Sequence, residues 1–147
     1  MNHHYQAYGN WSFALDDYLK QGLMGYLNKP VFEEMAAIVD PYSYRDRLTM
    51  PKIVLCAAGD EFFLPDSAQF FIHDLPGETY LNIIPDAEHS LATAYIDVGD
   101  TITTFYQLIL NKTPRPIFTY DLQKGNDSAS ITVRVAPGQQ VRLPLSY

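Results

Sequence analysis

Residues 52–58 are the part of this sequence that most constrains how the chain can fold. They form a short, nearly continuous apolar run, which Gly59 and Asp60 close. Such a run is typical of a strand buried on both faces, and strands of that kind belong to parallel sheets that helices cover. The segment therefore predicts a sheet whose strands are joined by helices, and not an open hairpin.

The segments after this run continue the same pattern. We expect a helix over 66–75, with Asp66 or Ser67 as its N-cap. The Pro-Gly pair that follows should end this helix. A second strand is expected at 79–85, and a long amphipathic helix at 91–110. The order strand, helix, strand, helix predicts an α/β fold.

The segments before the run are predicted to be helical. Residues 11–27 carry apolar side chains at intervals of three and four, which predicts one amphipathic helix. A shorter helix is expected at 31–39, because Pro30 suits a helix start. Asp40 and Pro41 should end it, since a residue before proline is pushed out of helical dihedrals.

The sequence changes character after residue 113. Two segments, 117–120 and 130–135, alternate apolar and polar residues, as half-exposed antiparallel strands do. A third strand is expected at 140–143. We therefore predict two domains, an α/β part at 1–113 and the start of a small antiparallel β-sandwich at 114–147.

Composition excludes several classes of protein. A net charge of −7, from 10 basic and 17 acidic residues, opposes binding to nucleic acid or anionic lipid. The one cysteine, Cys56, excludes an internal disulfide and a thiolate zinc site, and we expect it to be a packing residue. No cofactor and no metal site are predicted. No run of about 18 apolar residues and no leader peptide is visible, so no transmembrane segment is expected.

Three of the six asparagines lie in acceptor sequons for N-glycosylation. These are Asn10-Trp11-Ser12, Asn111-Lys112-Thr113 and Asn126-Asp127-Ser128. Sequons act only in chains that enter the secretory route, so this enrichment favours an exported protein.

Asp60 and His89 are the candidate catalytic residues. Each follows a predicted strand, and the carboxyl ends of parallel strands converge on one crevice. Their separation of 89 − 60 = 29 residues is what one helix and one strand consume between consecutive parallel strands. A buried carboxylate that orients a histidine is the acid and base half of a Ser-His-Asp site.

The third member of such a site is missing from the sequence. In α/β-hydrolases the chain order is serine, then acid, then histidine. No serine here is flanked by glycines two positions away on both sides, as the Gly-x-Ser-x-Gly elbow requires. We therefore expect the nucleophile to lie upstream of residue 1, and this chain alone to be an inactive fragment.

Each candidate also has a simpler structural explanation. A Gly-Asp pair after a strand is commonly turn chemistry. Asp66 is the alternative acid, although an N-cap role is the more usual one for aspartate in that position. The pair His3 and His4 resembles a frayed terminus more than a metal site, because no third ligand is near in the sequence. Glu61 and Glu88 flank the candidates and are expected to be solvated.

Four phenylalanines are expected to line a core or a pocket, namely Phe62, Phe63, Phe70 and Phe71.

Four motifs resemble those of the PhoPQ-activated pathogenicity-related protein family. They are DPYSYRDRL at 40–48, GDEFFLPD at 59–66, LPG at 75–77 and IPDAEH at 84–89. The resemblance extends from about residue 8 to about residue 143. It implies an α/β-hydrolase fold whose serine elbow precedes this segment, followed by a small β-sandwich, in exported proteins. On that resemblance the acid is Asp60 and the base His89, with Asp86 in place of the usual asparagine.

Two functions remain open from the sequence. The first is a part of a secreted serine-hydrolase-like protein that acts on an ester or peptide bond of an unidentified small-molecule or peptide substrate. The second is a non-catalytic secreted effector that uses the same scaffold to engage a cell-surface receptor. A third hypothesis is a gene product without an independent role. Fold alone does not decide among them.

Overall fold

The computed structural model describes residues 2–138 as a mixture of helices and strands. The chain divides into two compact units, with the boundary between Phe105 and Tyr106. The elements are, in chain order, α1 (Asn2–Tyr8), η1 (Phe13–Leu15), α2 (Asp16–Lys20), η2 (Leu23–Tyr26), α3 (Pro30–Val39), η3 (Pro41–Arg47), β1 (Lys52–Ala57), η4 (Pro65–Phe70), η5 (Ile72–Asp74), β2 (Thr79–Ile84), η6 (Ala92–Ala94), α4 (Tyr95–Leu110), β3 (Phe118–Lys124) and β4 (Ala129–Val135), where η marks a 3-10 helix.

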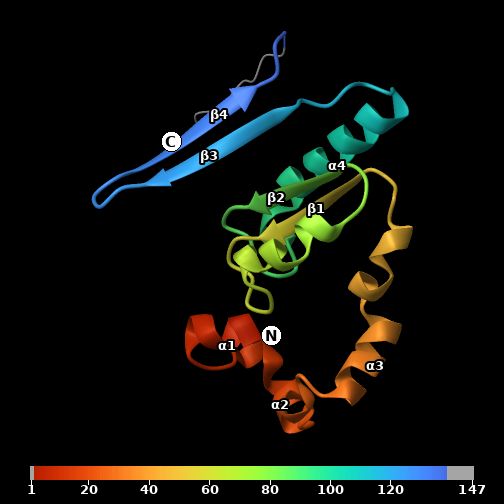
Figure 1. The fold of residues 1–147 in the computed structure, drawn as a ribbon, viewed down its shortest axis with the longest axis vertical. Helices are drawn as coiled ribbons and strands as arrows, with labels where there is room; N and C mark the ends of the chain where they lie inside the picture. Colours follow the sequence, from red (N-terminus) through yellow and green to blue (C-terminus); the bar gives the residue numbers. More distant parts are fainter. Residues whose placement is uncertain (1, 139–147) are drawn as a thin grey trace. The chain divides into compact units, whose positions relative to one another are not determined.

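The centre of the first unit is a parallel pair of strands, β1 and β2 (Figure 1). Their register runs from Lys52 opposite Thr79 to Ala57 opposite Ile84. Both strands lie where the apolar runs predicted them, and the parallel pairing is confirmed. Because the two strands pair residue by residue over their whole length, their carboxyl ends lie side by side.

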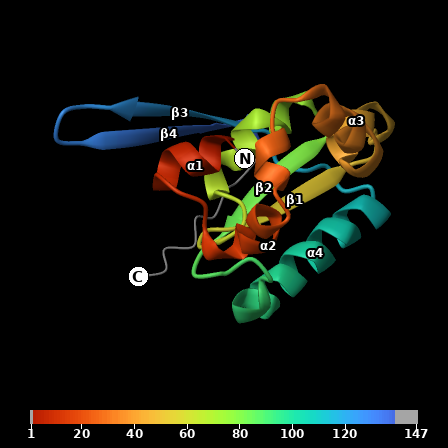
Figure 2. The same cartoon turned by 90° about the horizontal axis from the view of Figure 1, so that it is seen from below.

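Helix α4 covers one face of this sheet, and the N-terminal helices lie toward the other (Figure 2). The core on the α4 side consists of Ala57, Ile84 and Ala87, each 3% exposed or less, and Leu91 and Val98 are among the residues that pack on it. Small alanines at the strand ends let the connecting backbone approach the sheet closely. This close approach holds the segment after β2 against the end of β1.

Two of the predicted helices form as expected. Helix α3 begins at Pro30 and ends at Val39, one residue longer than the predicted range. After it, Asp40 is extended, and its carboxylate accepts a hydrogen bond from the N–H of Tyr42 at 2.9 Å. Asp40 therefore ends one helix and caps the next. The helix expected at 91–110 is confirmed as η6 followed by α4.

The helix expected at 11–27 is wrong as a single element. The structure breaks it into η1, α2 and η2. Gly22 has a φ of +71°, a left-handed conformation that ends a helix. At the other end, Ser12 caps η1, because its hydroxyl accepts a hydrogen bond from the N–H of Ala14. The spacing of apolar residues was compatible with one helix, but the local backbone chemistry favours three short turns.

The helix expected at 66–75 is also different in the structure. It consists of two 3-10 segments, η4 and η5, separated at Phe71, whose φ of −142° is not helical. Neither Asp66 nor Ser67 is the N-cap, because η4 already begins at Pro65. Proline at the first position sets the start one residue earlier, and the Asp66 carboxylate is bound elsewhere, as described below.

The second unit contains the antiparallel pair β3 and β4. Phe118 lies opposite Val135 and Lys124 opposite Ala129, so the alternating segments predicted as antiparallel strands pair as expected. Nearly all side chains of the two strands are exposed. The third strand expected at 140–143 lies outside the described residues.

These results establish a two-stranded parallel sheet with helices and a two-stranded antiparallel sheet. The hydrolase sheet, the β-sandwich and the domain boundary after residue 113 stay predictions. No helix within residues 2–138 is long and apolar enough to cross a membrane.

A pair of glycine substitutions tests the packing around the sheet. Gly77 has a φ of +77°, and a Cβ built on it would lie 2.5 Å from the backbone oxygen of Thr49. We expect Gly77→Ala to lower the free energy of unfolding by about 1–3 kcal/mol. Gly99 in α4 has open space at this position, so Gly99→Ala should raise it by roughly 0.5–1 kcal/mol. Urea denaturation measures both, and equal stability of the two variants would contradict the packing described.

Candidate active site

The site begins where β1 ends. The N–H of Ala58 donates to the carbonyl of Ile84, and the N–H of Gly59 donates to the carbonyl of Ala87, both at 2.9 Å. A Cβ on Gly59 would lie 3.1 Å from that Ala87 oxygen, so glycine allows the two loops to approach this closely. The loops after β1 and β2 are therefore tied together directly before Asp60 and His89.

Asp60 and His89 meet across this junction. Nδ1 of His89 lies 3.0 Å from both carboxylate oxygens of Asp60. The Asp60 side chain is 10% exposed, whereas the His89 side chain is 40% exposed. The structure thus brings together the two residues that the sequence singled out, with the carboxylate inside and the imidazole facing solvent.

The Asp60 carboxylate is fixed by three groups. Besides the His89 ring, the N–H groups of Phe62 and Phe63 donate to Oδ1 at 2.8 and 2.9 Å. The backbone of His89 is held separately, because its N–H donates to the Glu61 carboxylate at 3.2 Å. Asp60 is therefore held by two backbone N–H groups, and the backbone of His89 by a side-chain carboxylate.

These contacts shift the pKa of Asp60. Partial burial, the largest single influence, raises the pKa of this carboxyl, but the hydrogen bonds from Phe63, His89 and Phe62 together outweigh burial. The pKa of Asp60 consequently lies below its ordinary value, and the carboxylate is ionised at neutral pH. An ionised carboxylate only accepts hydrogen bonds, so the shared proton resides on Nδ1 of His89.

This tautomer leaves Nε2 of His89 as the basic nitrogen. Within residues 2–138 no group donates a hydrogen bond to that nitrogen. An imidazole held in this way can accept a proton from a hydroxyl and later return it to a leaving group, while the carboxylate stabilises the imidazolium. The arrangement is chemically suited to general acid–base work.

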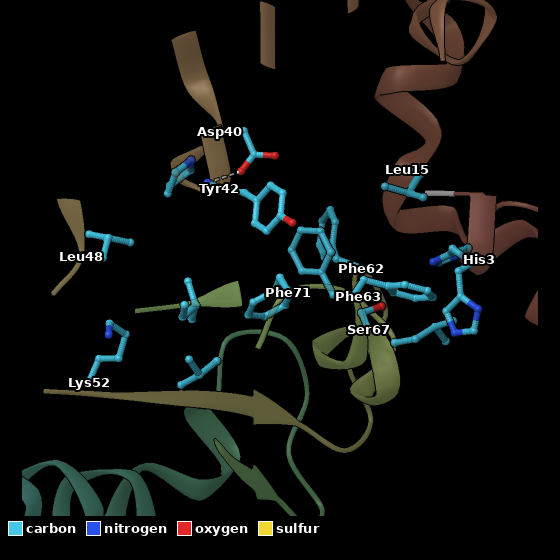
Figure 3. Close-up of a pocket in the computed structure, with 16 residues that line it drawn as sticks. His3, Leu15, Asp40, Tyr42, Leu48, Lys52, Phe62, Phe63, Ser67 and Phe71 are labelled. Atoms are coloured by element: carbon cyan, nitrogen blue, oxygen red, sulfur yellow. Dashed lines mark hydrogen bonds between the residues drawn. The ribbon is translucent and has the colours of Figure 1, made fainter. Parts of the chain in front are cut away.

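Two phenylalanine rings flank the imidazole. The ring centroids of Phe62 and Phe63 lie 4.5 and 5.6 Å from that of His89. The same two rings line a cavity (Figure 3), as do the other two phenylalanines predicted for such a role, Phe70 and Phe71. The expectation of a pocket lining is therefore confirmed for all four.

The alternative acid, Asp66, lies against a different histidine. Both of its carboxylate oxygens are 2.9 Å from Nε2 of His3. The expectation that His3 and His4 fray is wrong, because both belong to α1. His4 is only 5% exposed, and its Nε2 accepts a hydrogen bond from the N–H of Ser12 at 3.1 Å.

The glutamates beside the site are bonded, contrary to the expectation that they are simply solvated. Glu61 holds the backbone of His89, as described above. The Glu88 carboxylate accepts bonds from the N–H and hydroxyl of Ser90, and from the N–H of Ala92. The bonds from Ser90 lower the pKa of Glu88. Sequence alone gave no signal for either role, although a glutamate shortly before a helix start is compatible with capping.

The remaining candidates offer no further chemistry. Cys56 is half-buried in β1, and burial raises the pKa of its thiol, so the reactive thiolate is disfavoured. Asp86 has a φ of +53°, a left-handed conformation that aspartate and asparagine both tolerate. In the described part of the chain, no three His, Cys, Asp or Glu side chains are grouped so as to hold a metal ion.

Comparison with known proteins connects these features to one family. The family model for the PhoPQ-activated pathogenicity-related protein matches residues 1–143. Autocrine proliferation repressor protein A of Dictyostelium discoideum is 52% identical to the chain over 135 residues, which are 90% of this chain and 27% of that protein. The chain thus spans about a quarter of the length of this curated relative. No solved structure matches the chain.

The pH dependence of stability tests the geometry of the pair. Because folding lowers the pKa of Asp60, its ionisation stabilises the fold above the pKa of the unfolded state. That contribution is lost as the pH falls through the lower, folded pKa. We expect Asp60→Asn to reduce the free energy of unfolding by roughly 1–3 kcal/mol at pH 7, and the deficit to shrink as the pH is lowered through about 4 toward 2.

Asp100→Asn is the matched control, because Asp100 is exposed on α4 and has no hydrogen-bond partner among the described residues. Its stability should follow that of the wild type at every pH. A deficit of Asp60→Asn that is independent of pH would show that the carboxylate is not held as described.

Proposed function

We propose, because the chain belongs to the PhoPQ-activated pathogenicity-related protein family, that it carries the acid and the base of a serine-hydrolase-like site. The Asp60 carboxylate orients the His89 ring and stabilises its positive charge, and His89 accepts and returns the proton. The observation that carries this proposal is the contact of Nδ1 with both oxygens of a mostly buried Asp60, which leaves Nε2 outside that contact on an imidazole that is 40% exposed. The reaction class is hydrolysis of an ester or peptide bond.

The nucleophile in this proposal comes from outside the 147 residues. A serine on a strand–turn–helix elbow would present its hydroxyl to Nε2 of His89, and His89 would accept the proton as the serine attacks the carbonyl carbon. The sequence contains no Gly-x-Ser-x-Gly elbow. We therefore propose that the 147 residues by themselves do not catalyse hydrolysis.

The proposed scaffold is the C-terminal part of an α/β-hydrolase domain, followed by the start of a β-sandwich. Support comes from the parallel pairing of β1 with β2, from α4 on one sheet face, and from an acid that precedes the histidine in the chain. The antiparallel pair β3 and β4 has the pattern that a sandwich would begin with.

We also propose that the protein is exported. The curated relative is named an autocrine repressor, a word that describes a factor acting on the cells that release it. Three acceptor sequons are compatible with passage through the secretory route, and each acceptor asparagine is exposed on the described surface.

A second candidate function is a secreted effector without catalysis. The name of the relative, autocrine proliferation repressor protein A, favours it, since that name describes a signalling role and not a chemical reaction. In that case Asp60 and His89 would be a structural pair that joins two loops. The two candidates differ in whether His89 is needed for a chemical reaction.

A fluorophosphonate probe distinguishes the hydrolase from the effector when it is applied to the protein purified from the cells that produce it. Such a probe reacts covalently with an activated serine, so labelling depends on the base. We expect labelling of the wild type, and a loss of at least about 100-fold in its rate for His89→Ala and for Asp60→Asn. The labelled peptide, identified by mass spectrometry, would reveal the serine.

His73→Ala is the matched control, because His73 is an exposed histidine with no hydrogen-bond partner among the described residues. It should be labelled as fast as the wild type. A folded wild-type protein that takes no label, or a His89→Ala variant that labels at the wild-type rate, would refute the hydrolase and leave the effector.

A further inference from the structure

The described part of the first unit contains an apolar cavity of about 700 Å³ that the Asp60–His89 pair does not itself line. It lies beside β1, on the side of the sheet where Lys52 and Val54 point. Figure 3 shows Leu48 and Lys52 at one end and His3 and Leu15 at the other, with the rings of Tyr42, Phe62 and Phe71 between them. Its size falls in the range of small-molecule sites.

Several polar groups around this cavity are already engaged by the protein. The ammonium of Lys52 donates to the Pro76 carbonyl and the Thr79 hydroxyl. The His3 imidazole is held by Asp66. The Tyr42 hydroxyl bonds the Asp74 carboxylate. What remains toward the cavity is mostly aromatic and aliphatic surface.

The wall of the cavity and the candidate active site share two side chains. Phe62 and Phe63 line it and also contact the His89 ring. Phe63 and Phe70 are both 57% exposed, although each borders the apolar interior. Exposed aromatic rings at an apolar opening are a common feature of ligand entrances. The surroundings of His89 and the cavity wall therefore have these two rings in common.

We propose that this cavity binds an unbranched aliphatic acyl chain, so that the substrate class is an acyl ester whose carbonyl lies at His89. The inference rests on the proposed hydrolase function and names the substrate of that same site. The acyl chain packs between the aromatic rings, and the ester group stays beside Nε2 of His89.

The lining favours an acyl chain over the other substrates that a hydrolase could take. A peptide or a sugar buried here would need several hydrogen-bond partners, and each unpaired polar group would weaken binding. The Ser67 hydroxyl and Nδ1 of His4 have no hydrogen-bond partner among the described residues, but these two groups cannot satisfy a peptide backbone. An aliphatic chain needs no such partners.

Binding of dodecanoate by isothermal titration calorimetry tests this inference on the full 147-residue chain. We expect saturable binding below the micellar concentration, with affinity rising by about fourfold for each methylene added from octanoate onward. Ser67→Trp places a large ring in the cavity and should weaken binding at least about tenfold, and Leu75→Trp, a second variant that fills the cavity, should do the same.

Ser130→Trp is the matched control, because Ser130 is exposed on β4 in the second unit. It should bind dodecanoate like the wild type. Thermal melts of each variant verify that it is folded.

The outcomes separate this inference from the hydrolase proposal. Absence of binding to the folded wild type, or unchanged affinity in both tryptophan variants, overturns the acyl cavity whatever the fluorophosphonate result. Binding that the tryptophans abolish supports the cavity, and a simultaneous failure of fluorophosphonate labelling would remove only the hydrolysis. In that event the site would be a carrier or sensor of acyl chains.

Discussion

The site depends on the in-register parallel pairing of β1 with β2. Ala57 lies opposite Ile84, so both strands deliver their following loops to the same edge of the sheet. Two backbone hydrogen bonds continue the pairing beyond the strands, and the second, from Gly59 to Ala87, stands directly before Asp60. A shift of register by one residue would reverse the facing of every side chain in the strand and separate the loops. The contact between Asp60 and His89 is therefore a consequence of strand pairing.

Burial gives the two members of this contact different roles. Asp60 is shielded and receives two backbone N–H groups in addition to His89, so its charge is fixed in place. His89 keeps a solvent-facing side, as a group that exchanges protons must. The other histidine–aspartate pair, His3 with Asp66, has similar distances, but its carboxylate is 56% exposed and receives no backbone N–H from residues 2–138. Similar distances alone would not have distinguished the two pairs.

Local sequence patterns predicted the elements in which apolar residues recur at the spacing of a strand or a helix. The apolar runs of β1 and β2, the stripe on α4 and the alternation of β3 and β4 all formed as expected. The candidate pair could also be found, because residues that follow neighbouring parallel strands must lie close together.

The other parts of the site could not be read in this way, because distant contacts determine them. His3 contacts Asp66, which lies 63 positions further along the chain. The Ser12 hydroxyl donates to the Glu61 carbonyl, 49 positions away. These bonds order α1 and draw Asp66 away from capping, and no local periodicity encodes them. The 3-10 turns of η4 and η5 were missed for a related reason, since Phe71 leaves helical dihedrals while its ring lines the cavity.

The protonation of the His89 ring is the most direct test of this account. In a chain labelled with ¹⁵N at histidine, long-range proton–nitrogen correlation spectra report which ring nitrogen carries the proton. For the neutral form of the ring we predict a strongly deshielded proton on Nδ1 of His89, an unprotonated Nε2, and loss of that proton signal in Asp60→Asn. A neutral His89 ring that is protonated on Nε2, or that exchanges freely between both tautomers, would contradict the contact on which the proposed site depends.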